Sequence, residues 1–242
     1  MRPVVKLDPG TYTMPDGSTI TIQREYDPYQ DAKPALVNNL GEFCSYCEDA
    51  YHQERDLQVE HVQPKSIYSA LKTKWSNFLL SCATCNGSDN KYTKNVVLNE
   101  YHLPHLNNTF KSLVYKAGGV VEVNPALAGE AYNHAKALIE LVGLNKRPAT
   151  SRRGDTRWKK RSKDWDKACE YRDKYKAGKI EIKNIIDLVY AGGGWSIWFT
   201  VFSGFDEVRK ALLDFPGTAK QYFDAANHYE PLDRNPGEAD PT

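Results

Sequence analysis

Four of the five cysteines form two pairs with the same internal spacing, Cys44-Ser-Tyr-Cys47 and Cys82-Ala-Thr-Cys85. Two thiolates three positions apart in a tight turn can reach one ion, and four of them make the tetrahedral set that Zn²⁺ prefers. Thiolates also suit iron–sulfur clusters, which is the alternative, whereas a redox motif needs only one such pair. We predict a structural zinc site in a reducing compartment, and we expect Cys169 to be a small packed side chain.

The segment between the two pairs carries residues that a purely structural knuckle does not need. Residues 57–64, LQVEHVQP, alternate like a strand and end in the adjacent acid and imidazole of Glu60 and His61. A second apolar run, WSNFLLSC, contains Asn77 and leads into the second cysteine pair. Side chains that could take part in catalysis therefore cluster at the ends of two predicted strands.

Asparagines follow the second pair. If a helix begins at Cys82-Ala-Thr-Cys85, Asn86 and Asn90 are four positions apart and share one of its faces. The chain order is then a strand with Glu60 and His61, a loop, a second strand, and a helix that begins with Asn86.

This order, CxxC, EHVxP, WxN and CxxCN, resembles the zinc-bearing HNH endonucleases, whose core is the ββα-metal motif. The resemblance covers residues 43–94 of 242. The three letters of the family name then correspond to His61, Asn77 and Asn86. Glu60 stands where the family often has the shorter Asp.

The resemblance implies phosphodiester hydrolysis. His61 would be the general base for water, since an imidazole with an ordinary pKa of about 6.5 is largely neutral in the cell. Glu60 and Asn86 would hold one Mg²⁺ or Mn²⁺, because hard divalent ions take oxygen ligands. Asn77 would brace the loop behind His61 rather than bind metal.

Three further residues have roles that the resemblance suggests. Asp89 or Asn90 would supply another ligand to the catalytic ion, and the pattern does not choose between them. Lys91 would contact phosphate.

The flanks of this core more loosely resemble the HNH proteins of Septu-type bacterial phage defence, which act with a partner ATPase. The similar pieces are DAKPALVNNLGEFCSYCE, LNEYHLPHLNN, LVGLN and WFTVF with FPGTA. This resemblance implies a defence nuclease with an ATPase protein partner.

The charge is unevenly distributed. The whole chain has a net charge of +1, from 32 basic and 31 acidic residues, which argues against a general nucleic-acid coat protein. Residues 146–183 contain 15 Lys or Arg and 6 Asp or Glu, a net of +9, so the rest carries 1 − 9 = −8. Interleaved aromatics favour a surface for the phosphate backbone over a merely solvated helix face. The strongest candidates are Arg152, Arg153, Arg157, Lys159, Lys160 and Arg161.

Turn and periodicity signals place the remaining elements. We predict a β-hairpin over Thr11–Gln23 and another around Gly118 and Gly119. Apolar periodicity and stop signals predict helices over 31–40, 129–144 and 158–176. An apolar unit over 195–223 follows a glycine break, and we expect its first residues to be core.

We therefore predict an α+β protein with three parts. Residues 1–42 form a hairpin and helix arm, 43–95 the zinc-stapled HNH core, and 96–242 a mixed and then mostly helical region that includes the basic segment. The longest apolar stretch, 195–202, falls far short of the ~20 residues of a spanning helix. The first ten residues lack the apolar run of a secretory signal, so we expect a cytoplasmic protein with no membrane partner.

The expected function is metal-dependent endonucleolytic cleavage of DNA. Two alternatives stay open at this point. One is a catalytically inactive zinc-knuckle module that binds nucleic acid, and the other is an RNase that uses the same site. A ββα-metal unit grips the phosphate backbone and need not read bases, so RNA remains a second candidate substrate.

Overall fold

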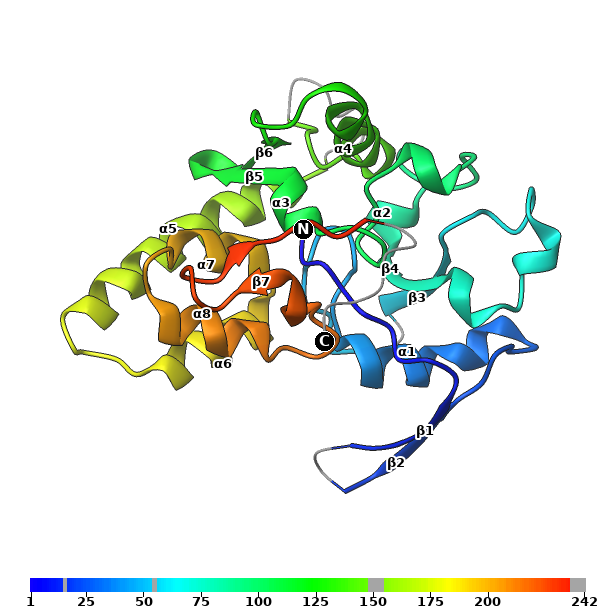
Figure 1. The fold of residues 1–242 in the computed structure, drawn as a ribbon, viewed down its shortest axis with the longest axis horizontal. Helices are drawn as coiled ribbons and strands as arrows, with labels where there is room; N and C mark the ends of the chain where they lie inside the picture. The colour runs from blue at the N-terminus through cyan, green and yellow to red at the C-terminus, as the bar shows by residue number, and fades with distance from the viewer. Residues whose placement is uncertain (15–16, 54–55, 148–154, 236–242) are drawn as a thin grey trace.

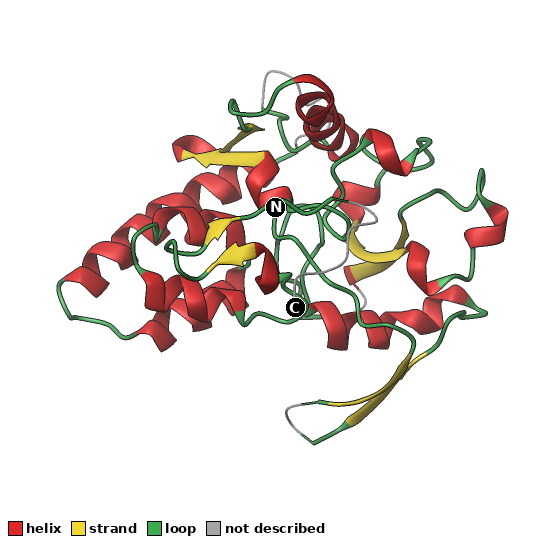
Figure 2. Cartoon of the chain, in the orientation of Figure 1, coloured by secondary structure: helices red, strands yellow, loops and turns green. Residues whose placement is uncertain are grey.

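A computed structural model describes residues 1–14, 17–53, 56–147 and 155–235. The described residues form short two-stranded antiparallel sheets and helices, and the predicted α+β class is confirmed (Figures 1 and 2). The strands are β1 (Gly10–Thr13), β2 (Thr19–Ile22), β3 (Leu57–His61), β4 (Phe78–Cys82), β5 (Leu113–Lys116), β6 (Val120–Val123), β7 (Phe223–Asp224) and β8 (Glu230–Pro231). The α-helices are α1 (Lys33–Leu40), α2 (Ala83–Asn86), α3 (Thr109–Ser112), α4 (Gly129–Val142), α5 (Arg157–Lys176), α6 (Ile182–Gly192), α7 (Trp195–Val201) and α8 (Asp206–Leu213).

Both predicted hairpins are present. The β1–β2 hairpin projects from the body of the molecule in Figure 1. The β5–β6 hairpin turns through Gly118 and Gly119, both with positive φ. A Cβ on Gly119 would lie 2.0 Å from the Trp158 carbonyl oxygen of α5, so the absence of a side chain lets this turn pack directly on that helix.

The central β3–β4 pair carries the predicted site residues. The strands are antiparallel, with Glu60 opposite Leu79 and His61 opposite Phe78. All of β4 is buried, as expected for a strand covered on both faces. A 3₁₀ turn over Trp75–Asn77 leads directly into β4 and places Asn77 beside the end of β3.

The helix that follows β4 is shorter than predicted. α2 makes a single turn and ends before Gly87. The Asn90 side-chain amide donates to the Thr84 carbonyl oxygen at 2.7 Å, and a continuing helix would need that oxygen for the N–H of Ser88. The expectation that Asn86 and Asn90 share a helix face is therefore wrong.

The helices at 129–144 and 158–176 are confirmed within two residues at each end, as α4 and α5. α5 packs against α7 and the β5–β6 turn, and α6 packs against α8. The apolar start of the 195–223 unit is core, as expected: Trp195, Trp198 and Phe199 are almost fully buried. Among the described residues, no helix has both the length and the apolar character to cross a membrane.

The glycine break couples these helices to the first cysteine knuckle. Gly194 N–H donates to the Glu48 carbonyl oxygen at 3.0 Å, one residue after Cys47. The Glu48 carboxylate accepts hydrogen bonds from the backbone N–H and the hydroxyl of Ser196 at the start of α7. The C-terminal helices thus dock on the chain that carries two of the cysteines.

Gly193→Ala is expected to destabilise the protein by about 2 kcal/mol or more. Gly193 has φ +77° and ψ −151°, a region that is nearly exclusive to glycine. A Cβ there would lie 2.0 Å from the Glu48 carbonyl oxygen. The matched control is Gly192→Ala, since a Cβ on Gly192 would meet nothing within 4 Å. Thermal unfolding of both variants tests this, and equal midpoints would contradict the packing argument.

Candidate active site and metal centre

The four paired cysteines converge in the fold. Cys44 and Cys47 come from the loop after α1, Cys82 ends β4, and Cys85 lies in α2. All four are buried, and their Sγ atoms lie within 4.8 Å of one another. The Sγ atoms of Cys47 and Cys82 are 3.8 Å apart. A tetrahedron with Zn–S bonds of about 2.3 Å has edges of about 3.8 Å, so the cluster fits one zinc ion.

Hydrogen-bond donors surround these sulfurs, as expected where several thiolates lie close together. The backbone N–H of Cys82 points at Cys44 Sγ, and that of Cys85 points at Cys82 Sγ, both at 3.4 Å. The Arg157 guanidinium donates to Cys85 Sγ at 3.0 Å and to the Gly143 carbonyl oxygen. Four thiolates and one Zn²⁺ would carry a net charge of −2, and the Arg157 guanidinium, which also pairs with Asp155 at 2.6 Å, is a cation held beside them.

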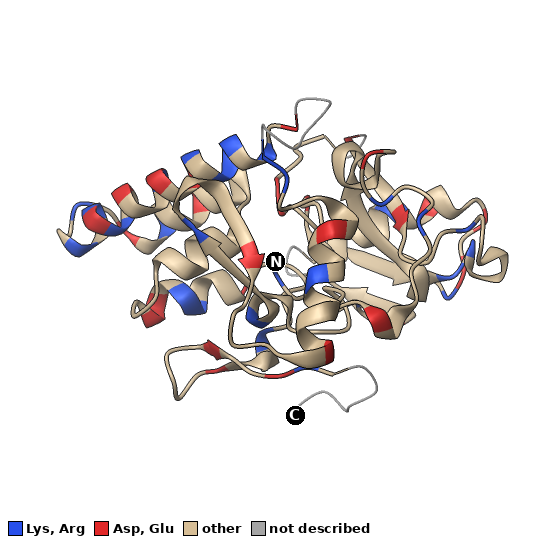
Figure 3. Ribbon diagram, turned by 90° about the horizontal axis from the view of Figure 1, so that it is seen from above, with Lys and Arg blue, Asp and Glu red and all other residues tan. Residues whose placement is uncertain are grey.

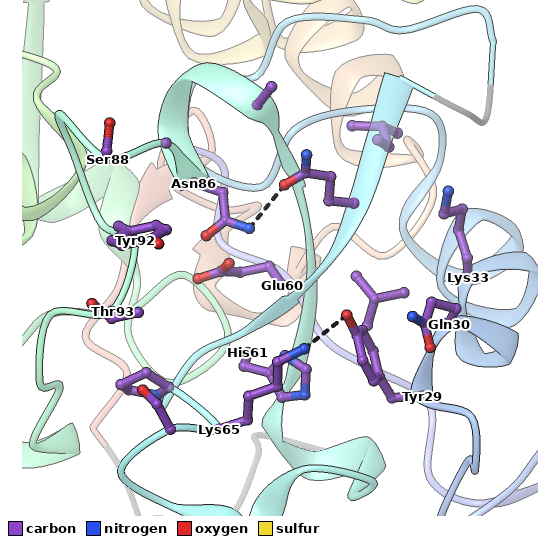
Figure 4. Close-up of a pocket in the computed structure, with 17 residues that line it drawn as sticks. Tyr29, Gln30, Lys33, Glu60, His61, Lys65, Asn86, Ser88, Tyr92 and Thr93 are labelled. Atoms are coloured by element: carbon purple, nitrogen blue, oxygen red, sulfur yellow. Dashed lines mark hydrogen bonds between the residues drawn. The ribbon is translucent and has the colours of Figure 1, made fainter.

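A cavity of about 750 Å³ lies beside β3. Glu60 and His61 of β3 and Asn86 of α2 lie between its two walls (Figure 4). One wall is formed by Tyr29, Gln30 and Lys33 and by Lys65. The other is formed by the chain after α2, namely Ser88, Tyr92 and Thr93. Sequence reasoning missed both walls, because these residues carry no motif and only the fold brings them to β3.

The His61 imidazole is held in one tautomer. Its Nε2 lies 2.8 Å from the Lys72 carbonyl oxygen, which can only accept, so Nε2 carries the proton and Nδ1 keeps its lone pair. The rings of Tyr29 and Phe78 contact the imidazole edge-on, with centroids 4.7 and 5.2 Å away. Burial lowers the pKa of His61 below its usual value, and nearby lysines lower it further.

Glu60 is paired within the protein. Its Oε1 lies 2.5 Å from Lys91 Nζ, and both side chains are 1% exposed. The same Nζ donates to the His61 carbonyl oxygen at 2.6 Å, and the Tyr46 hydroxyl donates to Glu60 Oε1 at 3.4 Å. Burial raises the pKa of Glu60, whereas Lys91 opposes that rise by favouring the carboxylate. The expected phosphate contact at Lys91 is thus corrected: its ammonium is buried against Glu60.

Lys91→Met is expected to destabilise the protein by about 3 kcal/mol, because it leaves the Glu60 carboxylate buried without its counter-ion. Lys94→Met is the matched control, since Lys94 is exposed only three residues away. Adding Glu60→Gln to Lys91→Met removes the uncompensated charge and should recover part of the loss. Urea unfolding measures all three variants, and an unchanged midpoint for Lys91→Met would contradict the assignment.

Asn77 and Lys6 hold the turn behind His61. The Asn77 side chain accepts from the Gln63 N–H at 2.8 Å and donates to the Gln63 carbonyl at 2.9 Å. Lys6 Nζ donates to the carbonyl oxygens of Trp75 and Phe78 on either side of Asn77, at 2.6 and 2.9 Å. These contacts join the turn to the chain after His61, and Asn77 does not line the cavity.

Glu60 and Asn86 present oxygens to the same cavity. Asn86 Nδ2 donates to Gln58 Oε1 at 2.9 Å, which orients the amide, and its side chain lies beside Glu60 in Figure 4. A carboxylate and an amide carbonyl are the hard donors that Mg²⁺ and Mn²⁺ take, and Mg²⁺ usually keeps several waters. The residues present thus fit such an ion.

Neither Asp89 nor Asn90 lines this cavity. Asn90 is buried, and its Oδ1 accepts from Lys146 Nζ at 2.7 Å. Lys146 Nζ also donates to the Asp89 carbonyl oxygen at 2.6 Å. The expectation that one of the two completes the ion site is corrected by this placement.

Three of the six predicted nucleic-acid contacts in the basic segment make contacts within the fold instead. Arg157 donates to Cys85 of the four-cysteine cluster, and Arg161 is buried, donating to the carbonyl oxygens of Gly119 and Leu144. Both arginines were expected to contact nucleic acid, and their burial corrects this. Lys160 pairs with Asp49 and Asp164.

The exposed face of α5 does not form a uniformly basic surface. Lys159 is exposed and stays a candidate contact. Basic residues come first along α5, and acidic residues are interspersed with them from Asp164 onward (Figure 3). Arg152 and Arg153 lie outside the described residues.

Comparison with known proteins points to the same region. Residues 44–91 match the family model of the HNH endonucleases. This range begins at Cys44 and includes the other three paired cysteines. It also includes Glu60, His61, Asn77 and Asn86.

The chain is also 41% identical over 56 residues to the Septu protein PtuB of Bacillus thuringiensis. That similarity covers 23% of this chain and 22% of the PtuB chain. It is thus confined to about a quarter of either protein.

Proposed function

We propose, from the HNH match over residues 44–91, that this protein is a metal-dependent endonuclease that hydrolyses DNA phosphodiester bonds. One observation carries the proposal. A neutral imidazole, with its Nε2–H committed to a backbone carbonyl, lies in one cavity with the oxygen donors of Glu60 and Asn86.

The residues have separable tasks in this reaction. His61 Nδ1 takes a proton from water as the water oxygen bonds to phosphorus, the bond from phosphorus to the 3′-oxygen breaks, and the 3′-oxygen takes a proton from solvent water. A Mg²⁺ or Mn²⁺ held by Glu60 and Asn86 would stabilise the negative charge on the phosphate and the leaving oxygen. Lys91 fixes the Glu60 carboxylate, and Asn77 fixes the chain that follows His61.

The similarity to a Septu protein supports a role in bacterial phage defence. On this basis we propose that the chain is the nuclease effector of such a system and acts with a partner ATPase. The partner would control when the nuclease is active.

The test is cleavage of supercoiled plasmid DNA by the purified chain, alone and after co-purification with its co-expressed neighbours. Nicking that requires Mg²⁺ or Mn²⁺ supports the proposal. DNA binding without any metal-dependent cleavage in the complex would favour an inactive zinc-knuckle module. Cleavage of an RNA of matched sequence, with DNA left intact, would favour an RNase.

The cleavage rate is expected to persist below the pH at which an ordinary histidine becomes protonated. The base form of His61 exists above its pKa, and burial lowers that pKa from 6.5, so the acid limb of the pH–rate profile lies below pH 6.5. Measuring kcat/KM for cleavage of an oligonucleotide at pH values above and below 6.5 checks the position of this acid limb. An acid limb clearly above pH 6.5 would contradict the assignment of His61 as the base.

A further inference from the structure

Tyr92 stands out on the rim of the cavity. Its side chain is 59% exposed, although large aromatic residues are usually covered. Its backbone has φ +40°, in the left-handed region that a bulky residue seldom adopts. Such conformations are concentrated at functional sites, where the surroundings maintain them.

The opposite wall is cationic. Lys65 is exposed, its Nζ donates to the Tyr29 hydroxyl at 2.9 Å, and it lies 4.1 Å from the centre of the Tyr29 ring. Tyr29 in turn contacts His61, so the ammonium is held close to the reacting groups. Figure 4 shows Lys65 and Tyr29 on one side of Glu60 and Asn86, with Tyr92 on the other.

A cation on one side and an exposed ring on the other are the two elements that bind an unpaired nucleotide strand. The cavity of about 750 Å³ is in the size range of sites that enclose one small molecule, which is large enough for a single nucleotide. A base inside a duplex would have to leave its stack to reach Tyr92, at a cost of a few kcal/mol.

We propose that the cavity takes a single strand of nucleic acid, with its backbone at Lys65 and one base beside the scissile phosphate stacked on Tyr92. This rests on the proposed nuclease function and adds the form of its substrate. Tyr92 is then the residue that makes unpaired strands better substrates than duplexes.

The experiment measures binding rather than cleavage. The full chain carrying His61→Ala, which slows turnover, is titrated at fixed salt with a fluorescent single-stranded DNA and with its duplex. Tighter binding of the single strand is expected. Adding Tyr92→Ala should weaken single-strand binding by roughly 5- to 150-fold, the usual range for one stacked base. Tyr92→Phe, which keeps the ring, should stay near the parent.

A matched control and a base-level test make the result specific. Tyr132→Ala removes another exposed tyrosine, on α4, and should leave both affinities unchanged. Removing single bases from the oligonucleotide in turn should weaken binding at one position with the parent, and at none with Tyr92→Ala.

Several outcomes overturn the proposal. They are equal affinity for single strand and duplex, no binding of either, or no effect of Tyr92→Ala on the single strand. If wild-type protein cleaves DNA but Tyr92 has no effect on binding, the nuclease function stands and the single-strand site falls. If binding depends on Tyr92 but no metal supports cleavage, the single-strand site stands and the nuclease function falls.

Discussion

Replacing His61 by alanine is expected to lower the rate of metal-dependent DNA cleavage by about 10²- to 10⁴-fold, the usual contribution of a general base. The physical reason is the hydrogen bond from Nε2 to the Lys72 carbonyl, which leaves Nδ1 as the free lone pair of this ring. No other histidine lines the cavity among the described residues. Alanine removes the base and adds no new group, so water must be deprotonated by solvent.

The measurement is the initial rate of plasmid nicking, made on wild type and variant of equal zinc content. His134→Ala is the matched control, because His134 lies on α4, where alanine is favourable, and does not line the cavity. Equal nicking by wild type and His61→Ala would remove His61 from the base role. A loss of rate that comes with a lowered unfolding midpoint would instead indicate structural damage.

Cys82→Ser is expected to abolish cooperative folding of the core, the largest stability effect we predict. Zinc binding contributes about 10–16 kcal/mol in zinc-finger peptides, which exceeds the stability of most domains. The cluster joins the loop after α1 to the end of β4 and to α2, and it anchors Arg157 of α5. Losing one thiolate therefore removes a link between four separate parts of the chain.

Zinc content per chain, measured by mass spectrometry, and thermal unfolding test this expectation together. The wild type should carry one zinc and unfold cooperatively, whereas Cys82→Ser should carry little zinc and lose that transition. Cys169→Ser, which changes the half-buried cysteine of α5, should retain both. A normal unfolding midpoint for zinc-free Cys82→Ser would refute a structural role. Iron in place of zinc would favour the iron–sulfur alternative.

The elements that the sequence predicted well depend on local signals. The two hairpins follow from glycines at their turns, and α4 and α5 follow from apolar spacing and stop residues. The zinc cluster follows from two turns with the same cysteine spacing. Each of these signals lies within a few residues of the chain, where steric preference and side-chain period act directly.

Most of the errors involve residues whose partners are distant in sequence, whereas the early end of α2 has a local cause. Lys91 reads as a surface cation, yet Glu60, 31 positions earlier, draws it into the core. Arg157 and Arg161 belong to a basic run, and carbonyl groups and a cysteine from other segments bury them. α2 stops early because the Asn90 side chain occupies the Thr84 carbonyl oxygen.

The sequence alone therefore predicts the four clustered cysteines, the strand that ends in Glu60 and His61, and the hairpins and helices around them. Only the tertiary structure decided which charges are exposed and which residues wall the cavity, with Tyr29 and Tyr92 the clearest cases. The physical reason is that residue type and spacing set local conformation. Burial, ion pairing and the neighbours of a site depend instead on contacts between segments that are far apart along the chain.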